Sequence, residues 1–148
     1  MYTHILVSTD GSELAQNGVN HGLSLAKALG SKITIVTVTA PFPVPTIGAG
    51  GWATAGMDLD RFEDGNKEHA KAILSAAKAA AEKMALTVET FHIPNALPAA
   101  AIVDAAKTQG CNLIVMASHG HRGIKRVLLG SQTAEVLATA HIPVLVIH

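Results

Sequence analysis

The chain has 148 residues, enough for one domain that buries roughly two-thirds of the surface its unfolded form exposes. Eleven Lys and Arg residues balance eleven Asp and Glu residues, so no long-range field attracts nucleic acid or an anionic membrane. Composition therefore argues against a nucleic-acid function and predicts a single globular domain over residues 1–148.

Short runs rich in β-branched residues alternate with segments of helical apolar spacing. The expected strands are 4–9, 32–39, 87–93, 112–117 and 143–147. The expected helices are 12–29, 59–85, 98–109 and 131–140. All strands but the third are nearly continuous in Val, Ile and Leu, which is typical of a parallel sheet covered on both faces. The alternation predicts right-handed βαβ units in one doubly wound, five-stranded parallel α/β sheet.

The stretch 40–58 contains three prolines and four glycines and is too long for an ordinary connection. It is either a mobile flap or binding loop, or an insertion without a role.

Cys111 is the only cysteine, so neither an intrachain disulfide nor a cysteine-based zinc site forms. It precedes an apolar run, which indicates a buried and unreactive thiol. The first residues show no signal-peptide pattern, and no apolar run approaches the roughly twenty residues of a spanning helix. We therefore expect a cytoplasmic protein without a membrane partner.

Ligands of open parallel sheets bind beyond the carboxyl ends of the strands, and the loop after the fourth strand is the most informative. It carries Ala117, Ser118, His119 and Gly120, then nine residues, then Gly130, Ser131, Gln132 and Thr133. Glycines let backbone approach a ligand, and a helix start offers free N–H groups and a positive dipole end. These features predict an anion site, although a tight turn and a Ser131 helix cap would explain the same residues.

The loop after the first strand, from Ser8 and Thr9 through Asp10 to Ser12, has the opposite character. Asp10 would repel a phosphate and suits a neutral donor such as a ribose hydroxyl or an adenine amino group. A helix-capping carboxylate is the alternative. If both loops bind one ligand, sugar and base lie toward Asp10 and phosphates toward Gly130, which is the polarity of a nucleotide.

Charged residues between these glycines are weaker signals. His121, Arg122, Lys125 and Arg126 either neutralise phosphates or form a solvated face. His119 and His121 are closely spaced but stand with no carboxylate, so we predict no metal site there.

The whole chain resembles the universal stress protein family. The resemblance is carried by 5–12 (ILVSTDGS), 114–120 (IVMASHG), 128–131 (LLGS) and 142–147 (IPVLVI). Nucleotide-binding members of that family carry a glycine, two residues, a second glycine, nine residues, and then a glycine with Ser or Thr. Gly120, Gly130 and Ser131 fit this pattern, whereas Ala117 departs from its first glycine by one methyl group.

The resemblance implies the strand order three-two-one-four-five and ATP, or AMP, bound between strands one and four, with Mg²⁺ reached through the phosphates. It implies that Asp10 contacts the nucleoside and that the Val38 backbone meets adenine. The other implied ligand-binding residues are Ser8, Thr9, Met116, Ala117, Ser118, His119, Gly120, Gly130, Ser131, Gln132 and Thr133. It further implies a homodimer through the last strand, 143–147.

The leading hypothesis is therefore an ATP-binding regulatory protein of the stress response. A slow ATPase is one alternative, with Lys125 and Arg126 as candidate cations, but no base and no Walker pattern stand in the sequence. A dimeric interaction protein with a vestigial pocket is another, and Ala117 favours it. We predict no catalytic residue, and a flavin carrier is set aside because Asp10 stands where such proteins bind phosphate.

Overall fold

The computed structural model describes residues 1–43, 52–121 and 129–148. Strands and helices alternate along these ranges. They are β1 (His4–Ser8), α1 (Glu13–Leu29), β2 (Lys32–Val38), α2 (Trp52–Lys83), β3 (Glu89–Ile93), α3 (Pro98–Thr108), β4 (Leu113–Ala117), α4 (Ser131–Thr139) and β5 (Val144–Ile147). The strands form one parallel sheet in the order β3-β2-β1-β4-β5, which confirms the predicted fold class and strand order.

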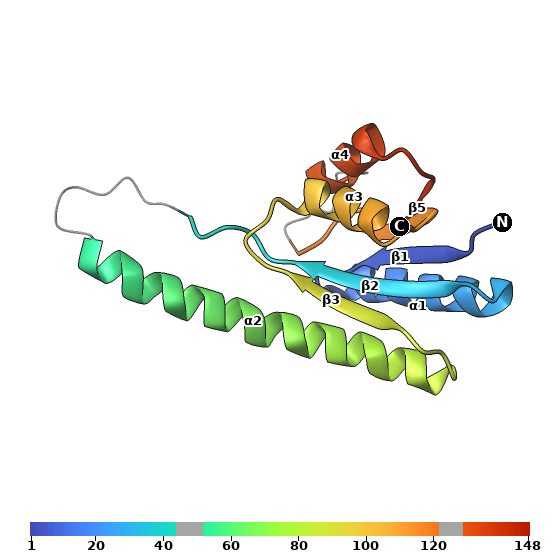
Figure 1. Ribbon diagram of the computed structural model, residues 1–148, viewed down its shortest axis with the longest axis horizontal. Helices are drawn as coiled ribbons and strands as arrows, with labels where there is room; N and C mark the ends of the chain where they lie inside the picture. Colours follow the sequence, from blue (N-terminus) through green and yellow to red (C-terminus); the bar gives the residue numbers. More distant parts are fainter. Residues whose placement is uncertain (44–51, 122–128) are drawn as a thin grey trace.

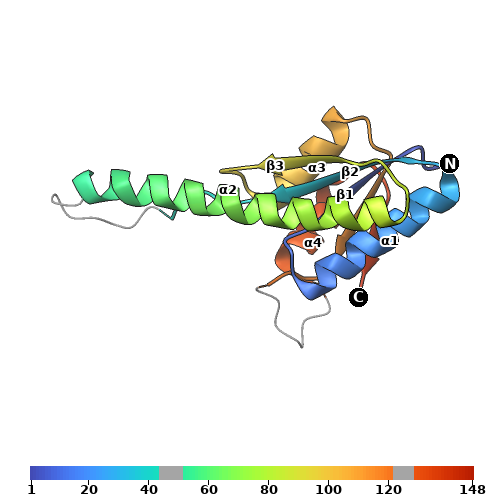
Figure 2. The same cartoon turned by 90° about the horizontal axis from the view of Figure 1, so that it is seen from below.

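Helices cover both faces of the sheet, α1 and α2 on one side and α3 and α4 on the other (Figures 1 and 2). Side chains of β1 alternate between two apolar clusters because successive residues of a strand point to opposite faces. Ile5 and Val7 pack with α1 and α2, whereas Leu6 packs with α3 and α4. All three are fully buried, which explains why this strand is apolar at consecutive positions.

β1 is the point at which the winding of the sheet reverses. Its residue Ile5 pairs with Ile33 of β2 on one side and with Leu113 of β4 on the other. After β1 the chain passes through α1 to β2, on the side away from β4. After β4 it passes through α4 to β5, on the side away from β1. The carboxyl ends of β1 and β4 are therefore neighbours with no helix between them. Such a switch point is the usual ligand crevice of a doubly wound sheet.

The two ends of α1 are specified by single residues. Ser12 is the N-cap, and its Oγ accepts a hydrogen bond from the Ala15 N–H at 3.2 Å. Gly30 ends the helix in the left-handed conformation with φ of 66°, so the helix ends after residue 29, as expected. Within the helix, a Cβ at Gly22 would lie 2.5 Å from Val7, so this glycine lets α1 approach β1 closely.

The start of α2 differs from the prediction. The helix begins at Trp52 rather than at residue 59, so the irregular stretch 40–58 ends sooner than expected. The prolines and glycines that predicted irregular structure are concentrated in 41–51, and only Gly56 follows them. The part of the predicted flap at 44–51 lies outside the described residues.

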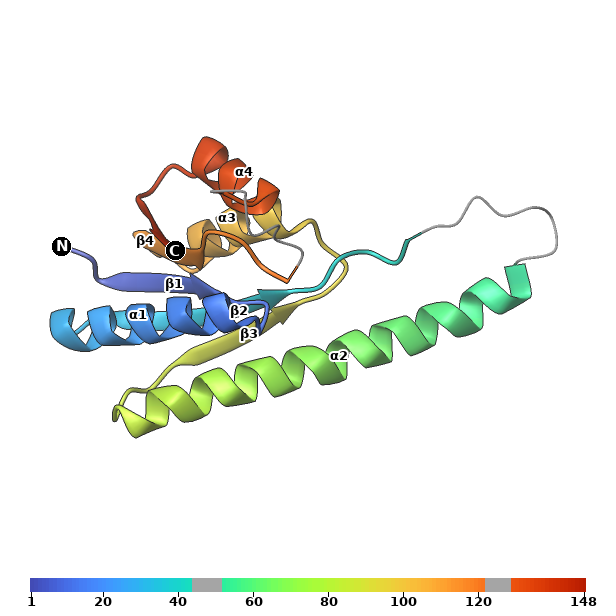
Figure 3. The same cartoon turned by 180° about the vertical axis from the view of Figure 1, so that it is seen from behind.

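α2 reaches well past the sheet. Its carboxyl-terminal half packs on the sheet through Ala70, Leu74, Ala77 and Ala81, all buried. Its amino-terminal half projects beyond the ends of β2 and β3 (Figures 1 and 3). None of the described helices, α2 included, is both long and apolar enough to cross a bilayer.

Cys111 lies in the core cluster beneath α3 and is 6% exposed. Burial raises the pKa of its thiol to about 11, although nearby Lys32 acts in the opposite direction. The thiol is therefore protonated at neutral pH, as expected for an unreactive cysteine.

Candidate functional site

Asp10 occupies the turn that follows β1. Its Oδ1 accepts a hydrogen bond from the Ser12 N–H at 3.0 Å, which forms a tight turn through Gly11. Gly11 has a φ of 81°, a conformation that favours glycine. Because Ser12 is the cap of α1, the alternative that Asp10 caps this helix is wrong.

The same carboxylate also holds the loop that follows β4. The His121 N–H donates to Asp10 Oδ2 at 3.0 Å, and His121 Nε2 lies 3.1 Å from the Asp10 carbonyl oxygen. A Cβ at Gly120 would lie 2.1 Å from Asp10 Oδ2, so any other residue at this position would displace the carboxylate. The turns after β1 and β4, which are 111 residues apart, therefore form one unit around Asp10.

Asp10 remains ionised at neutral pH. Burial alone would raise the pKa of its carboxyl group, but hydrogen bonds from Ser12 and from the His121 N–H outweigh that effect. Attraction to the His121 ring acts in the same direction, and the net pKa lies below its ordinary value. The site thus presents a negative charge whose orientation is fixed by the backbone.

The start of α4 has the opposite character. Gly130 is its N-cap, and its N–H donates to the Ser118 carbonyl at 2.7 Å. A Cβ at Gly130 would lie 3.3 Å from both Ser118 O and His119 Cα, so the helix start packs closely on the β4 loop. No side chain of the described residues caps the helix, and its first turn holds no acidic residue, so its N–H groups suit an anion.

Several predicted site residues have side chains that are buried or that bond to other parts of the protein. Gln132 Oε1 accepts from the Ala99 N–H at 3.0 Å, and Thr133 Oγ1 donates to the Ala117 carbonyl at 2.9 Å. The Met116 side chain lies in the core, and Thr133 is 2% exposed. Met116 and Thr133 therefore offer a ligand only backbone groups, whereas Gln132 is exposed and its bond to Ala99 uses only Oε1.

Other predicted residues support the two loops. Thr9 is buried, and its Oγ1 accepts from the Gly11 N–H at 3.2 Å. Ser118 is 2% exposed, and its Oγ lies 3.2 Å from Nδ1 of the half-buried His119. Ser8 is half-buried at the end of β1, where it pairs with β2. The side chains of Thr9, Ser118 and His119 thus form local hydrogen bonds within the loops that follow β1 and β4.

The Val38 backbone forms a free hydrogen-bonding edge beside Asp10. The Val36 carbonyl accepts from the Thr9 N–H at 3.0 Å, so Val36 faces β1. Alternate residues of a strand bond in the same direction, which means that Val38 also faces β1, but beyond its last paired residue, Ser8. Among the residues that the structure describes, no hydrogen bond involves the Val38 N–H or carbonyl on this side.

Sequence reasoning found Asp10, Gly120 and Gly130 but not the contact with His121. The turn Asp-Gly-Ser at 10–12 carries a local signal, because Asp side chains accept from the N–H two residues on. No local signal links His121 to a turn 111 residues away. Arg122, Lys125, Arg126 and Leu128 lie outside the described residues.

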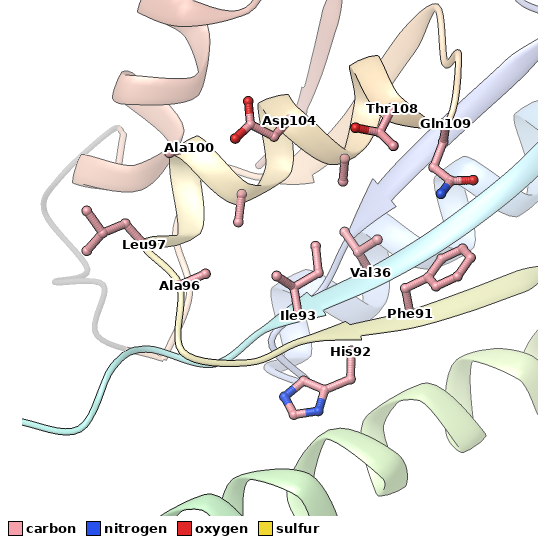
Figure 4. A pocket seen from close by; sticks show the side chains of 12 residues that line it. Val36, Phe91, His92, Ile93, Ala96, Leu97, Ala100, Asp104, Thr108 and Gln109 are labelled. Carbon is pink, nitrogen blue, oxygen red and sulfur yellow. The ribbon is translucent and has the colours of Figure 1, made fainter.

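Two surface hollows lie apart from the Asp10 turn. One, of about 530 Å³, lies between β3 and α3 and is flanked by Phe91, Ile93, Ala100 and Asp104 (Figure 4). The other, of about 460 Å³, lies between α2 and the ends of β2 and β3. Among the described residues, neither hollow is lined by the loops that follow β1 and β4.

Comparisons with known proteins agree over the full length. The sequence profile of the universal stress protein family matches residues 1–148. Universal stress protein MJ0531 of Methanocaldococcus jannaschii is 30% identical over 148 residues, which cover 99% of this chain and 82% of the relative. The structure of UspA from Lactobacillus plantarum is similar with a TM-score of 0.85 and 26% identity, over 99% of this chain and 98% of that one.

A further solved structure, a universal stress protein in complex with cAMP, has a TM-score of 0.69 and 26% identity, over 99% of this chain and 97% of that one. The similarity in sequence and in structure covers nearly the whole chain, and so includes the sheet and the loops that meet at Asp10. The chain belongs to the universal stress protein family.

Proposed function

We propose that this protein binds an adenine nucleotide, ATP foremost, across the carboxyl ends of β1 and β4. One observation carries the proposal: a fixed carboxylate and a free helix start lie at two ends of the same loop. The β4 loop contacts Asp10 through His121 and contacts Gly130 through Ser118. A ligand that is neutral at one end and anionic at the other matches this arrangement.

At the neutral end, Asp10 is ionised and accepts hydrogen bonds, which suits a ribose hydroxyl. The Val38 N–H and carbonyl offer one donor and one acceptor on the same edge. Adenine presents the complementary pair, an acceptor at N1 and a donor at its amino group. The base therefore lies against Val38 and the sugar against Asp10 in this proposal.

At the anionic end, the phosphates bind the backbone N–H groups of Ser131, Gln132 and Thr133 in the first turn of α4, since the Gly130 N–H already donates to Ser118. Micromolar binding requires about −8 kcal/mol, of which a helix dipole supplies about 1 kcal/mol and a charge-assisted hydrogen bond about 1.5–3 kcal/mol. Several donors must therefore converge, as a free helix start allows. Mg²⁺ binds through the phosphates rather than through a cluster of protein ligands.

Two further observations support the adenine nucleotide. A relative with 26% identity over nearly the whole chain was solved with cAMP, which contains adenine, ribose and phosphate. Ala117, which replaces the first glycine of the family pattern, is 8% exposed. In this proposal the methyl group of the buried alanine leaves the crevice open.

The proposal includes a regulatory homodimer in the cytoplasm, formed through β5. This strand ends the sheet, and its Leu145 is 38% exposed. A twofold contact between two copies of this edge strand would bury Leu145 of both copies and close the assembly. Sedimentation analysis tests this: Leu145→Asp should give a monomer under conditions in which the wild type sediments as a dimer, and a wild-type monomer would refute it.

Binding is tested by calorimetric titration of the purified protein with ATP and AMP in the presence of Mg²⁺. We expect micromolar ATP binding by the wild type. Gly130→Val should abolish it, because even the Cβ would lie 3.3 Å from the backbone of Ser118 and His119. Gly65→Val is the matched control, since a Cβ there meets nothing within 4 Å.

A second variant guards against misfolding of Gly130→Val. Asp10→Ala should weaken ATP binding by about 1–3 kcal/mol through the loss of a hydrogen bond to a charged group. A wild-type protein that binds neither nucleotide at millimolar concentration would overturn the proposal, as would equal affinity in the wild type and both site variants.

A further inference from the structure

We propose that Thr39 and His92, together with the turn at Asn95, hold the Val38 backbone in position and thereby make the site select adenine over guanine. The inference rests on the proposed function and deepens it, since it assigns base selectivity to residues that do not themselves touch the nucleotide. All three act as positioning residues on the strand end that carries Val38.

Thr39, which follows Val38 directly, is fixed through every polar group it has. Its N–H donates to the Ile93 carbonyl at 3.0 Å, and its own carbonyl accepts from the Ala96 N–H at 3.1 Å. Its Oγ1 lies 2.8 Å from His92 Nε2. A peptide held by a single hydrogen bond could rotate about that bond. Three hydrogen bonds in different directions fix both the position and the orientation of the peptide after Val38.

His92 belongs to β3 and points away from the hollow beside α3, toward α2 (Figure 4). It therefore meets Thr39 on the α2 face of the sheet, while its neighbours Phe91 and Ile93 flank the hollow on the other face. Burial lowers the pKa of His92, so its ring is neutral at pH 7 and brings no charge to the base end of the site.

The turn after β3 supplies the bond to the Thr39 carbonyl. Asn95 adopts a φ of 53°, a left-handed conformation that Asn tolerates better than most residues. This conformation reverses the chain directly after Pro94 and brings the Ala96 N–H back onto Thr39. The strained residue thus lies where it is needed to complete the set of bonds around Thr39.

A fixed Val38 edge discriminates between the purines by the direction of its hydrogen bonds. Guanine carries a donor at N1 and an acceptor at O6, the reverse of adenine, so it places donor against donor and acceptor against acceptor. A rigid edge cannot shift by half a residue to relieve this mismatch. A Val38 edge that is free to move can shift in this way. The site would then bind adenine more weakly and would exclude guanine less strongly.

The test compares ATP and GTP affinity in the full chain by calorimetry. Thr39→Val and His92→Phe each remove the side-chain hydrogen bond and preserve shape. We expect each variant to bind ATP about five-fold more weakly than the wild type, which corresponds to the loss of one neutral hydrogen bond. Its affinity for GTP should stay within about two-fold of the wild-type value. Because both changes remove the same bond, the double variant should be no weaker than either single variant.

His92→Gln provides the rescue, because its amide reaches the position of Nε2 and should restore the ATP preference. Thr90→Val is the matched control on the same face of β3 and should bind like the wild type. If the wild type binds no nucleotide, the proposed function fails. If the wild type binds ATP but Thr39→Val and His92→Phe keep its ATP-to-GTP ratio, only the positioning role fails; a ratio that His92→Gln does not restore likewise overturns it.

Discussion

Replacing Gly120 by alanine is the sharpest perturbation of the loop junction. The new methyl carbon would lie 2.1 Å from Asp10 Oδ2, and real Cβ contacts do not come closer than 3.0 Å. The carboxylate must therefore move by about 0.9 Å. The bond from the His121 N–H is already 3.0 Å long, and such bonds rarely exceed about 3.2 Å, so we expect a shift of this size to break it.

The cost follows from the bonds that are lost. A hydrogen bond to a charged group contributes about 1.5–3 kcal/mol, and the half-exposed position of Asp10 lets water replace part of it. We expect Gly120→Ala to lower the free energy of unfolding by about 2 kcal/mol. Gly65→Ala, with open space around its Cβ, should instead stabilise α2 by about 0.5–1 kcal/mol, as expected in a helix interior.

Urea unfolding at pH 7 and at pH 3 measures both the cost and its origin. The folded state holds the pKa of Asp10 below its ordinary value of 3.8, so the ionised carboxylate stabilises the fold above that pH. This contribution is lost as the pH falls through the folded pKa, and the difference between wild type and Gly120→Ala should shrink with it. A variant as stable as the wild type at pH 7 would refute the reasoning.

Three further predictions concern residues outside the junction. Gln132→Ala should cost about 1 kcal/mol in urea unfolding, because the Ala99 N–H at the start of α3 loses its partner; unchanged stability would contradict this capping role. Cys111 should react with a thiol reagent at pH 8 about 100-fold more slowly in the folded protein than in urea, since its pKa rises from 9.0 to about 11; equal rates would show an accessible thiolate. Burial, and to a lesser extent nearby Lys32, lowers the pKa of His4 from 6.5, so the unfolded state binds a proton more readily than the folded state. The free energy of unfolding should therefore fall as the pH drops below about 6.5. This pH dependence should be weaker in His4→Gln.

Much of the fold could be predicted because its signals are local. The continuous apolar runs identified buried parallel strands, and the expected helix limits at residues 12, 29 and 98 agree with the observed ends to within one residue. The start of α2 was predicted seven residues too late. The prolines and glycines are concentrated in 41–51, but Gly56 made the irregular composition continue to residue 58, so the change at Gly51 was overlooked.

The site could be predicted only in its outline. Asp10 and Gly130 were found because strand ends in a parallel sheet meet at one edge. Their partners were not, since the His121 N–H reaches Asp10 through a fold that brings distant turns together. Gln132 was predicted to line the ligand, but its side chain meets α3, a contact that no spacing along the chain reveals.

The arrangement of the helices gives this electrically balanced molecule a polarity. Each of α1, α3 and α4 begins near the sheet edge at which the preceding strand ends, and Gln132 ties the starts of α3 and α4 together. Their positive dipole ends are therefore collected on one side of a chain with a formal net charge of zero. The field of a helix dipole falls off within about one turn of the helix end. It therefore attracts a small anion only when that anion is already close to the helix starts. The positive potential on this side therefore comes from backbone groups, and not from a surplus of cationic side chains.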